Sequence, residues 1–218
     1  MRIKRLLATT LVAALFFVSC NRKYVTLDYT SAKGEVPQLS NLTFRFNKAL
    51  VPDSLINTWD STGYIDFEPK LAGRFRWEAP DQLVFSPSQP LAPATAYKAS
   101  LNKELVRHSK YDVAKTEDPI TFHTAALQLA DAQVMWVLQD EAARVAVPQL
   151  SLTFNYPVKP EDLKEKLGVT IDGAKTDIAF QTISSSNTVL VRLPHFKSED
   201  KTYEAKLTIA KGIRPEGG

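Results

Sequence analysis

The residues that could carry covalent or metal chemistry are few, and the first is Cys20, the single cysteine among 218 residues. A lone thiol cannot form an internal disulfide, so its role must be a different one. The three histidines, His108, His123 and His195, lie far apart in the chain. None of them has a second ligand at the spacing that zinc sites use. We therefore expect no bound metal and no cofactor.

Carboxylates are the next candidates, because two suitably spaced acids can hydrolyse a glycosidic bond. Acidic neighbours occur at residues 140–141, 161–162 and 199–200, in expected turns or at an expected helix start. Solvated carboxylates are ordinary at such places. The sequence also contains no glycine-rich phosphate loop, no Gly-x-Ser-x-Gly motif and no His-Glu-x-x-His motif. These observations predict a protein that is not an enzyme.

Aromatic side chains offer a binding chemistry instead, because exposed rings stack on sugars. Trp59, Trp77 and Trp136, with Tyr64 and Phe75, could line such a face. Trp77 lies in an expected strand, which favours a place in the core. Trp59 lies in a polar stretch that we expect to be a loop, so it is the better candidate for an exposed aromatic contact.

The elements that position these residues begin with an export signal. A basic start is followed by an apolar run from Leu6 to Val18, and Ser19 precedes Cys20. This order is typical of a secretory signal peptide over residues 1–19, whereas a membrane span needs about 20 apolar residues. The alternative is a transmembrane or an incidental apolar N-terminus with a stray thiol. The closing residues 17–20, Phe-Val-Ser-Cys, resemble the lipobox of bacterial lipoproteins.

The lipobox resemblance implies cleavage between Ser19 and Cys20 and acylation of the Cys20 thiol. Acylation would consume a thiol that is otherwise exposed and reactive. Several acyl chains hold a protein firmly on a membrane surface while its body stays in water. We therefore expect a lipid-anchored protein of the bacterial cell envelope, facing the periplasm.

Removal of the signal peptide also removes the charge excess. Without Arg2, Lys4 and Arg5, the 27 basic side chains fall to 24, which equals the number of acidic ones. The mature body is formally neutral and has no general basic field, so the sequence favours no nucleic-acid partner.

An internal repeat organises the remaining chain. The sequence Val-Pro-Gln-Leu-Ser occurs at residues 36–40 and again at 147–151, and Leu-Thr-Phe follows at 42–44 and at 152–154. Residues 95–101 are echoed later by residues 201–207, with Tyr97 answering to Tyr203. Two tandem copies of one module of about 100 residues fit these spacings.

We place the junction near residues 124–131. The expected divisions are residues 20–30 as lipidated tether and first strand region, 31–126 as the first module, and 127–218 as the second.

Apolar residues within each copy alternate with a period of two, which indicates strands with one buried face. Leu42, Phe44 and Phe46 alternate with Thr43 and Arg45. Further strands are expected at 24–30, 64–67, 75–77, 82–86, 96–101 and 120–124, and then at 132–138, 169–171, 178–181, 188–193 and 203–209.

Six or seven short strands per module, separated by Pro and Gly, predict an all-β chain of two tandem β-sandwiches. One short helix is expected at 160–167, beginning at Pro160 and ending at Gly168. Residues 52–56 occupy the equivalent place in the first module.

A set of spaced Phe, Trp, Pro and Tyr residues in the first copy resembles a bacterial Ig-like module: Phe67-x-Pro69, Gly73, Trp77, Leu83-Val-Phe85-x-Pro87 and Leu91-x-Pro93-x-Thr95-x-Tyr97. Prolines in the connection prevent it from pairing as a strand. Tyr97 is expected to re-enter the core and to tie the corner back to the backbone through its hydroxyl.

A lipobox followed by a basic stretch and two such modules is similar to the amino-terminal end of bacterial α2-macroglobulins. In that family macroglobulin-like, Ig-like sandwiches form the frame of a broad-spectrum protease inhibitor that traps proteases. The resemblance implies that this chain supplies anchor and scaffold, with proteases as partners of the parent protein. The family's thioester motif, Cys-x-Glu-Gln, has no counterpart here, no bait segment is recognisable, and the turn-forming residues 212–218 suggest a fragment of a longer parent.

Two other functions fit the same pattern of strands. One is an outer-membrane lipoprotein that binds polysaccharide through tandem sandwiches, with Trp59 as a contact residue. The other is a surface spacer or adhesin stalk with no ligand of its own.

Overall fold

The structure is a computed structural model, and it describes residues 23–140, 142, 144–197, 199 and 201–218. Among these residues strands dominate, with one short helix, α1 (Pro160–Lys164), and two 3-10 turns, η1 (Asp53–Leu55) and η2 (Lys103–Val106). The expected all-β class is therefore confirmed. The strands form four sheets, two in the N-terminal half (residues 23–124) and two in the C-terminal half (residues 125–218).

The N-terminal half contains a six-stranded sheet in the order β4-β6-β7-β3-β1-β9 and a four-stranded sheet in the order β2-β10-β8-β5. Their bounds are β1 Tyr24–Thr30, β2 Gly34–Glu35, β3 Leu42–Phe46, β4 Trp59–Asp60, β5 Ile65–Glu68, β6 Gly73–Ala79, β7 Gln82–Pro87, β8 Ala96–Leu101, β9 Val113–Lys115 and β10 Ile120–His123.

Alternation along β3 explains how these two sheets enclose a core. Leu42, Phe44 and Phe46 are buried, whereas Arg45 is exposed, as the period of two predicts. Leu42 lies opposite Phe85 of β7 across an antiparallel ladder. Aromatic rings from β3, β5, β6, β7 and β10 join one buried cluster, in which Trp77 is also enclosed. The expectation that Trp77 fills the core is confirmed.

The C-terminal half contains a four-stranded sheet in the order β11-β12-β16-β15 and a three-stranded sheet in the order β14-β13-β17. Their bounds are β11 Leu129–Asp140, β12 Val145–Val158, β13 Leu167–Ile171, β14 Ala174–Thr176, β15 Ala179–Phe180, β16 Ser186–Arg192 and β17 Ala205–Ile209. Leu150, Leu152 and Phe154 of β12 belong to a second buried cluster, together with Leu163 of α1.

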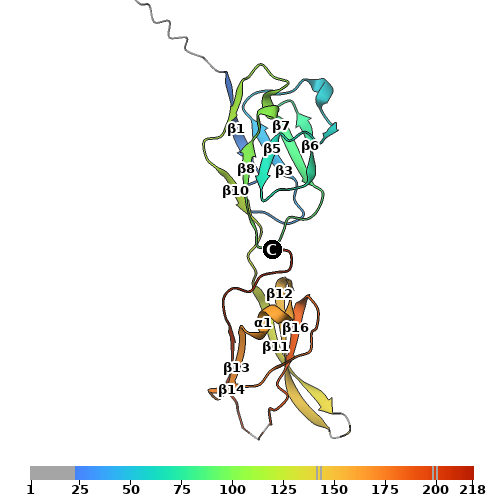
Figure 1. Cartoon of the computed structure of the whole chain (residues 1–218), viewed down its shortest axis with the longest axis vertical. Coiled ribbons are helices and arrows are strands. Elements are labelled where there is room, and N and C mark those ends of the chain that lie inside the picture. Colours follow the sequence, from blue (N-terminus) through green and yellow to red (C-terminus); the bar gives the residue numbers. More distant parts are fainter. Residues whose placement is uncertain (1–22, 141, 143, 198, 200) are drawn as a thin grey trace, which may run out of the picture.

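The two halves meet at a short connection, which Figure 1 shows between the two groups of strands. Thr124 is buried there, its backbone amide donates to Thr95 O at 3.0 Å, and its hydroxyl donates to Ala92 O at 2.7 Å. On the other side, the Asn155 side chain accepts from the Gln128 backbone amide at 2.8 Å and donates to Ala126 O at 2.8 Å. The positions of the module boundaries stay a prediction.

The repeated Val-Pro-Gln-Leu-Ser sequence adopts two different structures. Residues 147–151 belong to β12, where Leu150 is 7% exposed. Residues 36–41 instead cross from one sheet to the other, and Leu39 is 85% exposed. The Gln38 side chain holds this crossing by donating to Leu91 O at 2.6 Å. The first copy has one extra residue, Asn41, which fits a turn where the second copy continues straight.

Three local expectations are wrong in detail. The helix that begins at Pro160 ends with Glu165 as its C-cap, so Gly168 is a residue of β13 and not the helix stop. Trp59 lies in the short strand β4 and not in a loop, because its backbone pairs with Arg76 of β6. The strand expected to begin at Tyr203 begins at Ala205.

Candidate functional site

The lipidation residue Cys20 and the cleavage residue Ser19 lie outside the described residues, so their roles stay predictions. The first described residue, Lys23, is tied firmly to the body. Its backbone amide donates to the Asp112 carboxylate at 2.9 Å, and its carbonyl accepts from the Asp112 amide at 2.8 Å. Strand β1 then begins at Tyr24, so residues 24–30 are part of a sheet rather than a free tether.

Trp59 lies on the edge strand β4, and 45% of its surface is exposed. The guanidinium carbon of Arg76, from the neighbouring strand β6, lies 4.8 Å from the centre of the indole ring. Arg76 in turn pairs with Glu78, which accepts a hydrogen bond from Gln82 at 3.0 Å. One face of the ring is therefore covered by a cation, an arrangement that stabilises the ring position.

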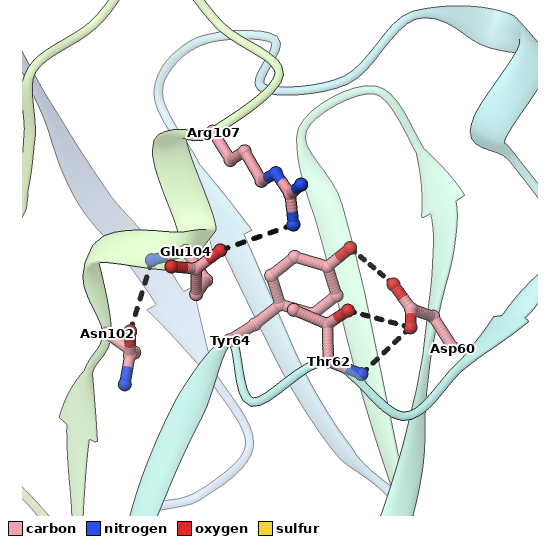
Figure 2. Close-up of polar contacts among 6 residues, drawn as sticks. All are labelled: Asp60, Thr62, Tyr64, Asn102, Glu104 and Arg107. Atoms are coloured by element: carbon pink, nitrogen blue, oxygen red, sulfur yellow. Dashed lines mark hydrogen bonds and ion pairs between the residues drawn. The ribbon is translucent and has the colours of Figure 1, made fainter.

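Asp60, the residue after Trp59, accepts three hydrogen bonds from the loop that follows it (Figure 2). The Thr62 amide and hydroxyl both donate to Asp60 Oδ1 at 2.8 Å, and the Tyr64 hydroxyl donates to Oδ2 at 2.6 Å. The Tyr64 ring is buried and meets Phe75 and Trp77 edge-on at 5.6 and 5.7 Å. This Asp60–Tyr64 group joins the loop to the aromatic core.

The electrostatics of the Asp60–Tyr64 group follow from these contacts. Partial burial raises the pKa of Asp60, but hydrogen bonds from Tyr64, Thr62 and Ser61 outweigh it, and the pKa lies below its ordinary value of 3.8. Burial, and then the hydrogen bond to the Asp60 carboxylate, raise the pKa of Tyr64 above 10.0. At neutral pH Asp60 is therefore a carboxylate and Tyr64 a neutral phenol. Their contact stabilises the loop, and neither group is placed as a base toward a ligand.

A second polar contact lies on the adjacent turn η2 (Figure 2). Asn102 caps this turn by accepting from the Glu104 amide at 3.1 Å, and its own amide donates to Asp66 at 2.8 Å. Glu104 forms an ion pair with Arg107 at 3.6 Å. Exposed pairs of this kind contribute little stability, so they order the loop without forming a reactive site.

The other residues that the sequence offered as functional candidates do not form one site in the structure. His108, His123 and His195 are all exposed on separate segments, and the described residues contain no group of three His, Cys, Asp or Glu that could hold a metal. Of the five aromatic residues considered for a sugar-binding face, Tyr64, Phe75 and Trp77 are buried. Exposed rings remain at Trp59 and at Trp136 of β11, which packs at 5.9 Å from Phe196.

The hydroxyl contact expected at Tyr97 is present in the structure. The Tyr97 hydroxyl accepts the Ala92 backbone N–H at 2.8 Å, which confirms the expected tie at the corner. Tyr203 makes the matching contact in the C-terminal half, where its hydroxyl accepts the Glu199 backbone N–H at 2.6 Å. The Asp60–Tyr64 group was missed by sequence reasoning, although an Asp two residues before a Thr is a known turn signal.

Comparison with known proteins gives one weak sequence match. The chain is similar to the α2-macroglobulin of Pasteurella multocida (strain Pm70). The two are 22% identical over 130 residues, which is 60% of this chain and only 7% of that protein's length. No model of a protein family matches the sequence.

Solved structures give weaker likenesses. L,D-transpeptidase 3 from Mycobacterium tuberculosis is 10% identical, with 69% of this chain and 47% of that chain covered and a TM-score of 0.30. An L,D-transpeptidase from Mycobacterium smegmatis is 16% identical, with coverage of 72% and 64% and a TM-score of 0.32. Scores this low carry no argument about fold or activity.

None of the helices in the described part of the chain is long and apolar enough to span a membrane.

Proposed function

We propose that the chain is the membrane-anchored, non-catalytic scaffold portion of a bacterial α2-macroglobulin-like protease inhibitor. The observation that carries the proposal is the similarity to the Pasteurella multocida protein over 130 residues. It agrees with the family resemblance of the sequence motifs, such as the Leu91-x-Pro93-x-Thr95-x-Tyr97 corner.

The scaffold in this proposal consists of two tandem Ig-like, macroglobulin-like sandwiches. Two observations support it: the two separate buried apolar clusters, and the matching contacts of the Tyr97 and Tyr203 hydroxyls. In the N-terminal half, interlocked aromatic rings such as Phe67 and Phe85, 4.6 Å apart, give a densely packed interior. Such stiff units transmit displacement without deforming, which a trap that changes geometry on cleavage requires.

The proposed role is mechanical, because the polar groups described above stabilise loops rather than face a reacting atom. Tyr64 donates its proton to Asp60, and Asp60 is held by Thr62. Neither group has the paired base or the raised carboxyl pKa that general acid–base catalysis uses. The chain would therefore position the inhibitor and leave the reaction to other parts of the parent protein.

The anchor is tested at Cys20. We expect cells fed radiolabelled palmitate to incorporate label into the wild-type protein, and expect Cys20→Ser to lose the label and to appear in the soluble envelope fraction. Asn21→Gln is the matched control, which should keep the label. Equal labelling of Cys20→Ser and wild type would contradict the lipid anchor, and protease digestion of the body on intact cells would contradict a periplasm-facing site.

The inhibitor role is tested on the full-length gene product, purified in detergent and mixed with an endopeptidase. A trap excludes large substrates from the enclosed protease but admits small ones. We expect hydrolysis of a large protein substrate to fall while hydrolysis of a short chromogenic peptide continues. Loss of both activities would indicate an ordinary active-site inhibitor, and loss of neither would remove the proposed function.

Polysaccharide binding is the second candidate, and the exposure of Trp59 favours it. Stacking of a sugar would use the ring face that Arg76 leaves open. In that case Trp59→Ala should weaken binding to an immobilised polysaccharide by roughly tenfold or more, whereas Trp136→Ala should not. If Trp59→Ala and Trp136→Ala bound the polysaccharide equally well, the polysaccharide-binding candidate would be rejected.

A further inference from the structure

The chain passes the connection between the two halves a second time. After β17, residues 210–218 return to the level of this connection, where Figure 1 marks the C-terminus. The Lys166 ammonium group donates to Gly212 O, and Gly212 has a φ of 93°, which glycine adopts without strain. Ile213 then packs against the buried cluster of the C-terminal half. We call residues 213–218 the strap.

The strap is attached to the C-terminal half along most of its length. The Glu216 backbone amide donates to Pro157 O of β12 at 2.8 Å. Pro215 is buried, and its carbonyl accepts from the Gly218 amide at 3.2 Å, which closes a turn. The strap is therefore an ordered extension of the C-terminal half.

The last residue of the strap contacts the N-terminal half. A Cβ atom on Gly218 would lie 2.3 Å from Pro93 O and 2.8 Å from Pro215 Cγ. The backbone of Gly218 thus lies directly against both prolines, at an approach that only glycine permits. Pro93 is buried like Pro215, although both lie outside the strands. This contact joins the two halves without a covalent bond.

The corner that receives Gly218 is held firmly by hydrogen bonds of the N-terminal half. The Thr95 hydroxyl donates to Pro93 O at 2.8 Å, and the Tyr97 hydroxyl accepts from the Ala92 amide at 2.8 Å. Thr124, from which the covalent connection continues, donates its hydroxyl hydrogen to Ala92 O at 2.7 Å. The covalent connection and the strap therefore reach the N-terminal half at the same ordered corner.

We propose that the strap is a conformational device that holds the two halves in one relative orientation. Two modules joined by one linker move relative to each other unless a further contact restrains them. The strap supplies that contact beside the linker, so both bending and twisting at the connection would separate Gly218 from Pro93. The contact joins two loops and no core residues, so it sets the orientation of the halves and adds little to the stability of either. This inference goes beyond the proposed function, because it holds whether or not the parent protein traps proteases.

Distances between two spin labels test the strap. The labels are placed at Lys98→Cys and Lys175→Cys, exposed positions on β8 and β14, in the full chain carrying Cys20→Ser so that no other thiol is present. We expect one narrow distance distribution by double electron–electron resonance. Addition of Gly218→Val should widen it at least about twofold, because the side chain cannot fit against Pro93 O. Gly168→Val is the matched control and should keep the narrow distribution, because nothing lies within 4 Å of its added Cβ.

A second variant releases the strap at its other attachment. Glu216→Pro removes the backbone N–H that donates to Pro157 O, and it should widen the distribution as Gly218→Val does. Circular dichroism should show the same strand content in all variants, which separates release of the strap from unfolding. A distribution that is already wide without Gly218→Val would overturn the proposal. So would a distribution that stays equally narrow in both strap variants, because the covalent connection alone would then fix the orientation.

Discussion

The hydroxyl of Tyr97 satisfies a backbone N–H that the Pro-rich connection leaves without a strand partner. The Tyr97 side chain is 4% exposed, and its oxygen lies 2.8 Å from the Ala92 nitrogen. Tyr203 accepts from Glu199 in the same manner, but Glu199 is exposed. The same contact therefore has different surroundings in the two halves, and the cost of losing it should differ.

Replacement of each tyrosine by phenylalanine tests this difference. Tyr97→Phe should lower the free energy of unfolding by about 1–2 kcal/mol, because it leaves the partly buried N–H of Ala92 without an acceptor. Tyr203→Phe should cost less than about 1 kcal/mol, because water can reach the freed Glu199 amide. Urea unfolding followed by tryptophan fluorescence and by circular dichroism measures both. Equal losses would mean that burial does not control the strength of this tie.

Asp60 gives the molecule an acid-sensitive contact. Its pKa in the folded chain lies below 3.8, so the unfolded carboxyl takes up a proton at a higher pH than the folded one. The stabilisation is therefore fully present above the unfolded pKa and is lost as the pH falls through the lower folded pKa. Wild type should be more stable than Asp60→Asn at pH 6, and the difference should shrink as the pH falls from 4 to 2. Unfolding curves across this range measure it, and a constant difference would contradict the assignment.

At the scale of elements, strand type and position followed from the sequence where alternation was regular. β1 and β8 have the expected bounds, and β3 buries Leu42 and Phe44 as expected. The repeated Val-Pro-Gln-Leu-Ser sequence shows the limit of this reasoning. Identical residues form a sheet crossing in one copy and a straight strand in the other, because tertiary pairing with Leu91 decides the first case.

Gly73 of β6 is a glycine that close packing requires, although local propensity disfavours glycine in a strand. A Cβ atom on Gly73 of β6 would lie 2.4 Å from Ser86 O and 2.5 Å from the Phe85 ring, so Gly73→Ala should force the strands apart. We expect a loss of about 1–3 kcal/mol. Gly168 of β13 is the matched control, because nothing lies within 4 Å of its added Cβ, and Gly168→Ala should be neutral or slightly stabilising. Thermal unfolding of both variants checks this, and a loss at Gly168 alone would contradict it.

At the scale of the whole molecule, the sequence indicated which single residues could be functional but not which side chains contact them. An exposed position for Trp59 was expected, but its stacking with Arg76 depends on the pairing of β4 with β6. The Asp60–Tyr64 group likewise depends on a loop conformation that aromatic packing around Tyr64 fixes. Contacts between separate strands have no local signal in the sequence, which is why these were not predicted.

The tandem arrangement predicts that damage to one core stays local. Leu83 and Leu152 are both fully buried, the first in the N-terminal cluster and the second in the C-terminal one. Truncation of either to alanine should cost about 2–5 kcal/mol within its own cluster. Because the hydrogen bonds of Thr124 and of Asn155 at the connection each stay within their own half, little of this loss should reach the other half.

Hydrogen exchange with peptide-level resolution shows whether the loss of stability stays in one half or reaches both. Leu152→Ala should speed exchange of slowly exchanging amides in β12, β13 and β16 and leave those of β3, β7 and β8 unchanged, and Leu83→Ala should do the reverse. If either variant loosened both sets of strands equally, the chain would unfold as one cooperative unit. The scaffold would then be a single body, and the proposal of two independently folded sandwiches would have to be abandoned.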